Sequence, residues 1–302
     1  MCGNLTADCL TSSKALLASS WTAVAKGYEE VLVQRFRPWT NDALEKMERY
    51  LGDHTHLIQS PNQDEISALV LCCGPGQELL PIAKMIPNCK VFGTDLASGM
   101  VDRAKARIDR ECQLRENSKY LSMISVDVGD ATDLPAGLQH DVIFSAFGLQ
   151  QIPHPIDAVR NWVRHLKPDG ICTILYWPPS QPQNNRPPED NCPFTLWGRL
   201  VRNRLGREGD ECVWDDKLVD AIEGHADVLK DELIEHEICW NDATELFDGM
   251  SKAGPWHALR LRRGDQFVDE LGARLIRFYS TGKREKLCHM FTARLIICKK
   301  RR

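Results

Sequence analysis

The chain has 302 residues, of which 43% are apolar and 26% are charged, and its formal net charge is −4. This composition is typical of globular chains and excludes wholesale disorder. The acidic balance argues against a nucleic-acid-binding protein that relies on an overall positive field. No apolar run approaches the roughly 20 residues that cross a bilayer, and residues 1–17 lack an apolar signal region. We therefore expect a cytoplasmic protein with no nucleic-acid partner and no membrane partner.

Helical periodicity marks the N-terminal part of the chain. Apolar side chains recur at the spacing of an amphipathic helix over residues 21–32. Pro38 is expected to interrupt this pattern before a second helix at residues 43–50. Residues 1–60 are thus predicted to form a helical extension, which covers the bound ligand as a lid.

From residue 66 the pattern changes to short apolar runs that alternate with helical segments. Such an alternation is typical of a parallel sheet with helices on both faces. The five runs are residues 67–73, 90–94, 121–126, 141–146 and 171–176. Six prolines then predict a flexible loop over residues 178–193.

Further elements follow that loop: a helix at residues 216–229, a strand at 233–240, a helical insertion at 243–280 and a last strand at 291–298. The prediction is an α/β fold with a Rossmann-like, doubly wound, seven-stranded and mostly parallel sheet. Residues 61–302 form its main domain. Twelve cysteines without a CxxC pair predict mostly buried, free thiols and no metal site.

A Gly-rich turn, Gly74-Pro75-Gly76, follows the first predicted strand. Such a turn before a helix lets the backbone approach a ligand closely and offers free N–H groups. The second strand ends at Asp95, whose carboxylate is placed to accept hydrogen bonds from both hydroxyls of a ribose. A dinucleotide and an adenosyl ligand both fit this pair of features.

An acid also follows the third strand, in Gly129-Asp130-Ala131, where a carboxylate can meet an adenine amino group. With these elements in order, residues 66–176 resemble the class I S-adenosylmethionine-dependent methyltransferases, specifically the small-molecule branch related to the ubiquinone-biosynthesis methyltransferases. Val70 stands where that family usually has an acid. The resemblance implies S-adenosylmethionine as cofactor, bound by Cys72, Cys73, Gly74, Gly76, Asp95, Leu96, Met100, Asp130, Ala131 and Phe147.

Methyl transfer requires that the nucleophile, methyl group and sulfur are aligned and that water is excluded. A general base is needed only when the acceptor atom starts protonated. Candidates for such a base are His257, His154 and Tyr28. Positions at the carboxyl ends of the strands and on the flanking helices predict the substrate-binding residues Trp21, Tyr28, Gln151, Tyr176, Trp177 and Trp256.

The sequence thus predicts an enzyme that transfers a methyl group from S-adenosylmethionine to an O, S, N or C atom of a small molecule. The sequence is compatible with a homodimer and leaves the oligomeric state open. The alternative is a catalytically silent, methyltransferase-like binding or scaffold protein, since Val70 replaces the usual acid. A nicotinamide-dependent oxidoreductase is a weaker competitor, because Leu79 stands at the third glycine position of its fingerprint.

Overall fold

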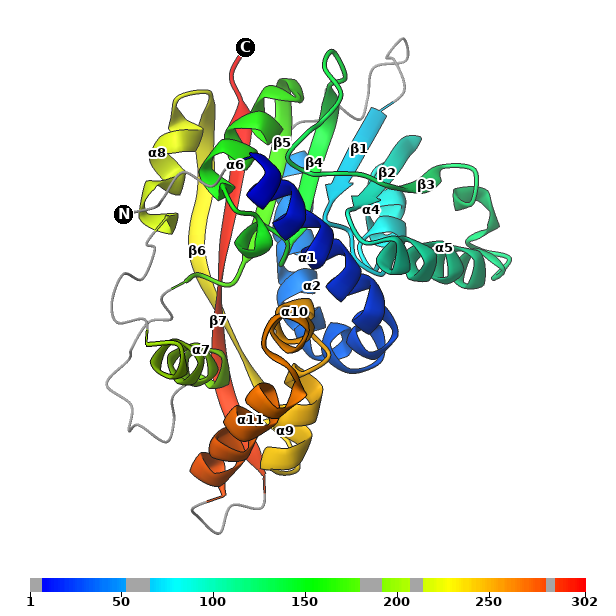
Figure 1. Cartoon of the computed structure of the whole chain (residues 1–302). Helices are drawn as coiled ribbons and strands as arrows, with labels where there is room; N and C mark the ends of the chain where they lie inside the picture. The colour runs from blue at the N-terminus through cyan, green and yellow to red at the C-terminus, as the bar shows by residue number, and fades with distance from the viewer. Residues whose placement is uncertain (1–6, 53–65, 180–191, 207–213, 281–285) are drawn as a thin grey trace.

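The computed structural model describes residues 7–52, 66–179, 192–206, 214–280 and 286–302. Most of the predicted flexible loop at 178–193 therefore lies outside the described residues. A seven-stranded sheet in the order β3-β2-β1-β4-β5-β7-β6 runs through the molecule (Figure 1). Its strands are β1 (Ile66–Leu71), β2 (Cys89–Asp95), β3 (Ile124–Val128), β4 (His140–Ala146), β5 (Leu166–Tyr176), β6 (Ala226–Trp240) and β7 (Leu287–Lys300).

Strand β7 is antiparallel to both of its neighbours, β5 and β6, whereas β1 to β5 pair in parallel. The order of the strands reverses between β1 and β4, which is where open α/β sheets bind ligands. This architecture confirms the predicted doubly wound, mostly parallel sheet.

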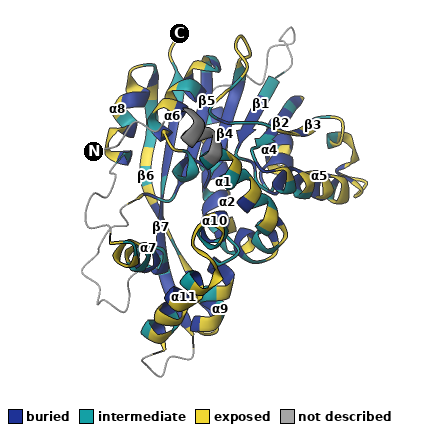
Figure 2. Ribbon diagram, viewed as in Figure 1, coloured by how far each residue is buried: buried dark blue, intermediate teal, exposed yellow. Residues whose placement is uncertain are grey.

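Two hydrophobic cores cover the two faces of the sheet, and Figure 2 shows the buried strands between partly exposed helices. Successive side chains of a strand point to opposite faces. In β1, Val70 faces a core that includes α2, α4 and α5, and Leu71 faces a core with α6 and α8. The helices are α2 (Gln34–Gly52), α4 (Leu79–Met85), α5 (Ser98–Cys112), α6 (Pro155–Arg164) and α8 (Leu218–Glu223).

The N-terminal extension is helical from Ala7 to Gly52: α1 (Ala7–Gly27), the π-helical turn η1 (Tyr28–Val33) and α2 follow one another without a loop. Pro38 lies inside α2, so the prediction that it interrupts the helix was wrong. A proline removes the N–H that would bond to the carbonyl four residues earlier. That residue, Gln34, directly follows the π-helical turn, where the hydrogen-bond register already changes. The Arg35 guanidinium donates to the Val31 carbonyl at 2.9 Å and satisfies one acceptor there.

The β6–β7 hairpin is longer than predicted and reaches beyond the parallel part of the sheet. Its register runs from Ala226 opposite Lys300 to Trp240 opposite Leu287. Residues 226–229, which the sequence places in a helix, are therefore strand, because pairing along β7 outweighs a local helical pattern. Three helices lie beside this part of the chain (Figure 1): α7 (Pro193–Arg204), α9 (Ala243–Met250) and α11 (Asp265–Tyr279). A fourth helix, α10 (Gly254–Arg263), packs against α1 and α11.

One disulfide joins Cys239 and Cys288, which lie opposite one another in the hairpin. The expectation of free thiols is wrong for this pair, because the register of β6 and β7 was not visible in the sequence. Among the described residues, free thiols include Cys72, Cys73, Cys112, Cys172, Cys192 and Cys298. Across the described ranges, no helix combines the length and apolarity that crossing a membrane requires.

Candidate functional site

A pocket lies between α1 and the residues that follow β1, β2, β3 and β4. It encloses about 790 Å³ of space, part of which is open to solvent. Figure 1 shows α1 crossing in front of the strands at this place. The predicted cofactor-binding residues that line the pocket are Cys72, Gly74, Asp95, Leu96, Met100, Asp130, Ala131 and Phe147.

The two remaining residues of that prediction, Cys73 and Gly76, lie behind the pocket wall. Cys73 is buried, and its N–H donates to the Thr94 carbonyl at 3.0 Å. Gly76 has a positive φ of 74°, and a Cβ on it would lie 2.9 Å from side-chain atoms of Ala104 and Leu79. These residues therefore shape the turn instead of contacting the pocket.

Asp95 lies at the end of β2, where both of its carboxylate oxygens accept backbone hydrogen bonds. Oδ2 accepts from Gly74 N–H and Oδ1 from Ala97 N–H, each at 2.9 Å. Burial raises the pKa of Asp95, and these two hydrogen bonds oppose the rise. Because a carboxylate oxygen has two lone pairs, each oxygen keeps one acceptor position for a ligand. Two such positions match the two hydroxyls of a ribose.

Asp130 lies after β3 and is already bonded to the N-terminal helix. Its Oδ2 accepts from Lys14 Nζ at 2.7 Å, and its Oδ1 accepts from the N–H and hydroxyl of Thr132 at 2.8 and 2.7 Å. Although burial raises the pKa of Asp130, the bonds from Lys14 and Thr132 lower it overall. One acceptor position remains, on Oδ2, for an amino group of a ligand. Sequence reasoning missed Lys14, because no local pattern links it to a residue 116 positions away.

Strained backbone flanks the pocket on two sides. Cys72 and Phe147 have φ angles of 53° and 58°, in the left-handed region that costs a residue other than glycine about 1–3 kcal/mol. A Cβ on Gly148 would lie 2.3 Å from Cys72 Cβ, so the turns after β1 and β4 are in close contact. Because neither residue is a glycine, the local sequence gave no direct sign of this conformation.

The predicted aromatic residues divide between the pocket and the core. Trp21 and Tyr28 line the pocket and meet edge to face, with ring centroids 5.1 Å apart. Trp177 lies outside the pocket, stacked behind Phe147 at 4.4 Å. Tyr176 points to the opposite face of the sheet, because neighbouring side chains of a strand alternate.

Trp256 also lies outside the pocket. It is buried on α10 and stacks on Trp197 of α7 at 3.7 Å, so it packs the helical layer around the hairpin. The partner helix α7 was absent from the prediction, which left the indole of Trp256 without an evident neighbour. Trp256, which the sequence predicts to bind substrate, therefore does not line this pocket.

Of the three candidate bases, only Tyr28 lines the pocket. Burial, together with the nearby charges of Glu78 and Asp95, raises the pKa of Tyr28 far above its ordinary value. Its hydroxyl therefore stays protonated near neutral pH. His154 is exposed at the start of α6, and His257 lies on α10; neither contacts the pocket. Gln151 lines it and offers an amide.

Glu78 is a buried acid that the sequence analysis did not single out. It directly precedes α4, and Gln77 Nε2 donates to its Oε1 at 2.9 Å. Burial raises the pKa of Glu78 from 4.5 to about 7, although Gln77 and the charge of Arg107 oppose this rise. The folded protein thus holds a proton on Glu78 that the unfolded chain releases at lower pH.

Replacing Glu78 with glutamine is expected to stabilise the protein at pH 8 by about 2 kcal/mol and to change little at pH 4. Below pH 4.5 the carboxyl is protonated in both states, and wild-type stability falls as the pH rises through about 7. A tenfold change in proton affinity is worth about 1.4 kcal/mol, which sets an upper limit near 3 kcal/mol. Urea unfolding at several pH values measures the difference. Glu116→Gln, at an exposed position, is the control; an equal effect of Glu78→Gln at pH 4 and pH 8 would contradict the prediction.

In a comparison with known protein families, residues 68–170 match the family model described as "Methyltransferase domain". The demethylmenaquinone methyltransferase of Lactobacillus johnsonii is 35% identical over 119 residues, which are 39% of this chain and 45% of that protein. The enzyme of the same name from Staphylococcus carnosus is 32% identical over 110 residues, 36% of this chain and 42% of that protein. The matched region thus spans less than half the length of these relatives.

Solved structures of similar fold cover more of the chain at lower identity. YjhP from E. coli aligns over 93% of this chain and 99% of its own with 18% identity and a TM-score of 0.51. YcgJ from Bacillus subtilis aligns over 87% and 99% with 16% identity and a TM-score of 0.52. At such identities the likeness concerns the fold alone, and it agrees with the predicted α/β architecture.

Proposed function

We propose that this chain, which carries a class I S-adenosylmethionine-dependent methyltransferase domain, binds its cofactor and a small acceptor molecule in the pocket under α1 and transfers a methyl group there. S-adenosylmethionine is the cofactor that goes with this domain. The observation that carries the proposal is the set of free acceptor positions. Asp95 keeps two, for two ribose hydroxyls, and Asp130 keeps one, for the adenine amino group.

When bound, S-adenosylmethionine would supply the methyl group to be transferred, bonded to a positively charged sulfur that is a good leaving group. The task of the protein is to align the acceptor and to exclude water. Gly74 and Cys72 form the wall next to Asp95, where the methionine part would lie. Trp21, Tyr28 and Phe147 enclose the remaining space with apolar rings.

Protonated Tyr28 is a hydrogen-bond donor in this pocket, and we assign it to orienting the acceptor. Neither histidine candidate reaches the pocket, so an acceptor that must lose a proton has to lose it without a histidine base. A carbon, sulfur or amine nucleophile that is reactive without a protein base fits this arrangement better than an aliphatic alcohol.

A groove between α1 and α10 supports entry of a small, largely apolar acceptor. It shares Lys14, Leu17, Gln151 and Pro153 with the pocket and is therefore continuous with it. Its further lining is mostly apolar: Ser13, Leu16, Pro255, Ala258, Leu259 and Arg262. We propose that the acceptor enters through this groove while the cofactor occupies the wall formed by Asp95 and Asp130.

Two measurements test the proposed function. Calorimetric titration with S-adenosylhomocysteine and with NAD distinguishes a methyltransferase site from a nicotinamide site, and we expect binding of the former alone. Incubation with methyl-labelled S-adenosylmethionine and a metabolite extract then reports transfer to small molecules. Binding of NAD without S-adenosylhomocysteine would refute the assignment. Cofactor binding without transfer to any extract component would favour the alternative of a catalytically silent binding protein. Light scattering of the same sample measures the molar mass and so tests whether the chain forms a homodimer.

A further inference from the structure

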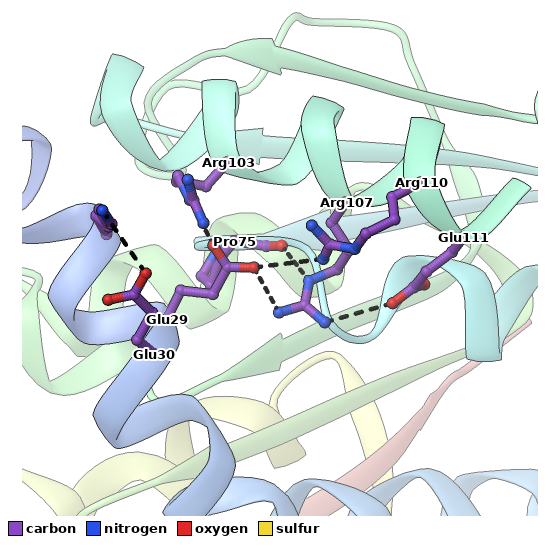
Figure 3. Close-up of polar contacts among 8 residues, drawn as sticks. Glu29, Glu30, Pro75, Arg103, Arg107, Arg110 and Glu111 are labelled. Atoms are coloured by element: carbon purple, nitrogen blue, oxygen red, sulfur yellow. Dashed lines mark hydrogen bonds and ion pairs between the residues drawn. The ribbon is translucent and has the colours of Figure 1, made fainter. Parts of the chain in front are cut away.

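A buried acid of the N-terminal extension lies beside the cofactor-binding turn. Glu29, on the π-helical turn η1, is only 6% exposed and is surrounded by arginines of α5 (Figure 3). Arg107 Nη2 donates to Glu29 Oε1 at 2.9 Å, and Arg103 Nε donates to Oε2. Arg110 adds a third cation at 3.8 Å. A carboxylate is tolerated at such burial because it is paired and hydrogen-bonded.

Arg107 connects this acid to the Gly-rich turn. The guanidinium is buried, and its Nε donates to the carbonyl of Pro75 at 2.9 Å (Figure 3). Its Nη1 also reaches Glu111 at 3.4 Å. The rigid fork of an arginine thus spans two partners at once, Glu29 on the extension and the backbone of the turn.

Within the turn, the Gly76 N–H donates to the Cys73 carbonyl at 2.9 Å, while the carbonyl of Pro75 is held from outside by Arg107. Cys72, Gly74 and Gly76 all have positive φ angles, of 53°, 51° and 74°. Pro75 lies between the two glycines and has no backbone N–H, so it cannot donate a hydrogen bond that would fix its position. Gly74 in turn lines the pocket and donates to Asp95 Oδ2. A shift of the Pro75 carbonyl would therefore move the residue that contacts the cofactor.

We propose that Glu29 and Arg107 are positioning residues, which hold the cofactor-binding turn in its competent conformation through the carbonyl of Pro75. This inference rests on the proposed function. Neither residue lines the pocket, so both act through the turn. Tyr28, the neighbour of Glu29 on η1, does line the pocket. The π-helical turn thus places Tyr28 in the pocket and the next residue, Glu29, against Arg107, which contacts the Gly-rich turn.

The test compares Glu29→Gln with Glu30→Gln. Glu30 is the adjacent acid on η1, but it is 55% exposed and its nearest cation, Lys26, is 4.0 Å away. We expect Glu29→Gln to weaken S-adenosylhomocysteine binding by about tenfold. This is the loss that results when the Gly-rich turn adopts its binding conformation in only about a tenth of the molecules. Glu30→Gln should bind within twofold of wild type, about the reproducibility of such a titration. A lower melting temperature with unchanged affinity for Glu29→Gln would overturn the proposal and leave a purely structural ion-pair cluster.

Hydrogen exchange provides a second readout that needs no cofactor. Amides of residues 72–78 should exchange faster in Glu29→Gln than in Glu30→Gln, while amides of β5 stay protected in both. Equal exchange in the turn of the two variants would overturn the positioning role. Failure of wild type to bind S-adenosylhomocysteine would instead refute the proposed function, and the exchange measurement would still decide the role of Glu29.

Arg107→Lys keeps a charge near Glu29 without the planar fork, so it serves where Glu29→Gln does not fold. A lysine cannot bond Glu29 and the Pro75 carbonyl in the same geometry. We expect faster exchange in residues 72–78 and weaker S-adenosylhomocysteine binding in this variant. Wild-type exchange and affinity in Arg107→Lys would contradict the proposal.

Discussion

Asp95→Ala is expected to weaken binding of S-adenosylmethionine by about 2–4 kcal/mol, or roughly 30-fold to 1,000-fold in dissociation constant. The substitution removes the acceptor of both proposed ribose hydrogen bonds. It also leaves the N–H groups of Gly74 and Ala97 without the carboxylate oxygens that accept from them. Calorimetry with the purified protein measures the loss.

Asp127→Ala is the matched control for this experiment. Asp127 lies near the end of the neighbouring strand β3, but its side chain is 86% exposed and its pair with Lys105 spans 3.6 Å. Such an exposed pair contributes little, so cofactor affinity should stay at the wild-type value. Wild-type affinity in Asp95→Ala would remove Asp95 from the binding site.

Deleting residues 1–27, which contain α1, should lower turnover and cofactor affinity together. The helix contributes Leu17, Ala18 and Trp21 to the pocket, and its loss opens the site to water. We expect kcat/KM to fall on the order of a hundredfold, since ordering and water exclusion both depend on closure. Methyl transfer from labelled cofactor, with the acceptor found in the extract, measures this change.

The truncation also removes packing, so its control must separate stability from closure. A Cβ on Gly254 of α10 would lie 2.4 Å from the Trp21 ring, which shows how closely α1 is seated. Trp21→Ala keeps the helix and should reproduce part of the loss, whereas Lys26→Ala at an exposed position should not. A truncated protein that melts early but binds cofactor and turns over normally would show that α1 is only a stabilising cap.

Local pattern was sufficient for the central sheet, because each strand carries its own apolar run and each turn its own glycine or acid. The Gly-rich turn and Asp95 follow from that pattern, and the structure brings them into contact. Lys14 and Glu29 were missed because their partners lie 116 and 78 positions away. A lysine or glutamate on a helix is normally solvated, so only the tertiary structure reveals these contacts.

Other differences have the same physical origin. Residues 226–228 pair with β7, and so this segment is not part of the helix that its sequence predicts. Trp256 and Tyr176 pack into cores whose other members come from distant segments. Aromatic residues near a predicted site are consequently poor indicators of pocket walls, since the same side chains are the preferred filling of a core.

The contact between Lys14 and Asp130 ties the helix and the ligand into one equilibrium. Thermodynamic reciprocity requires that a ligand bound to Asp130 changes the equilibrium for docking of α1 by the same factor by which docking of α1 changes the affinity for the ligand. Both side chains are partly exposed, with fractions of 36% and 26%. Dissolved salt therefore screens their attraction. Raising the ionic strength should weaken the attachment of α1 to Asp130 and, through it, cofactor binding, although the other residues of α1 at the pocket are uncharged.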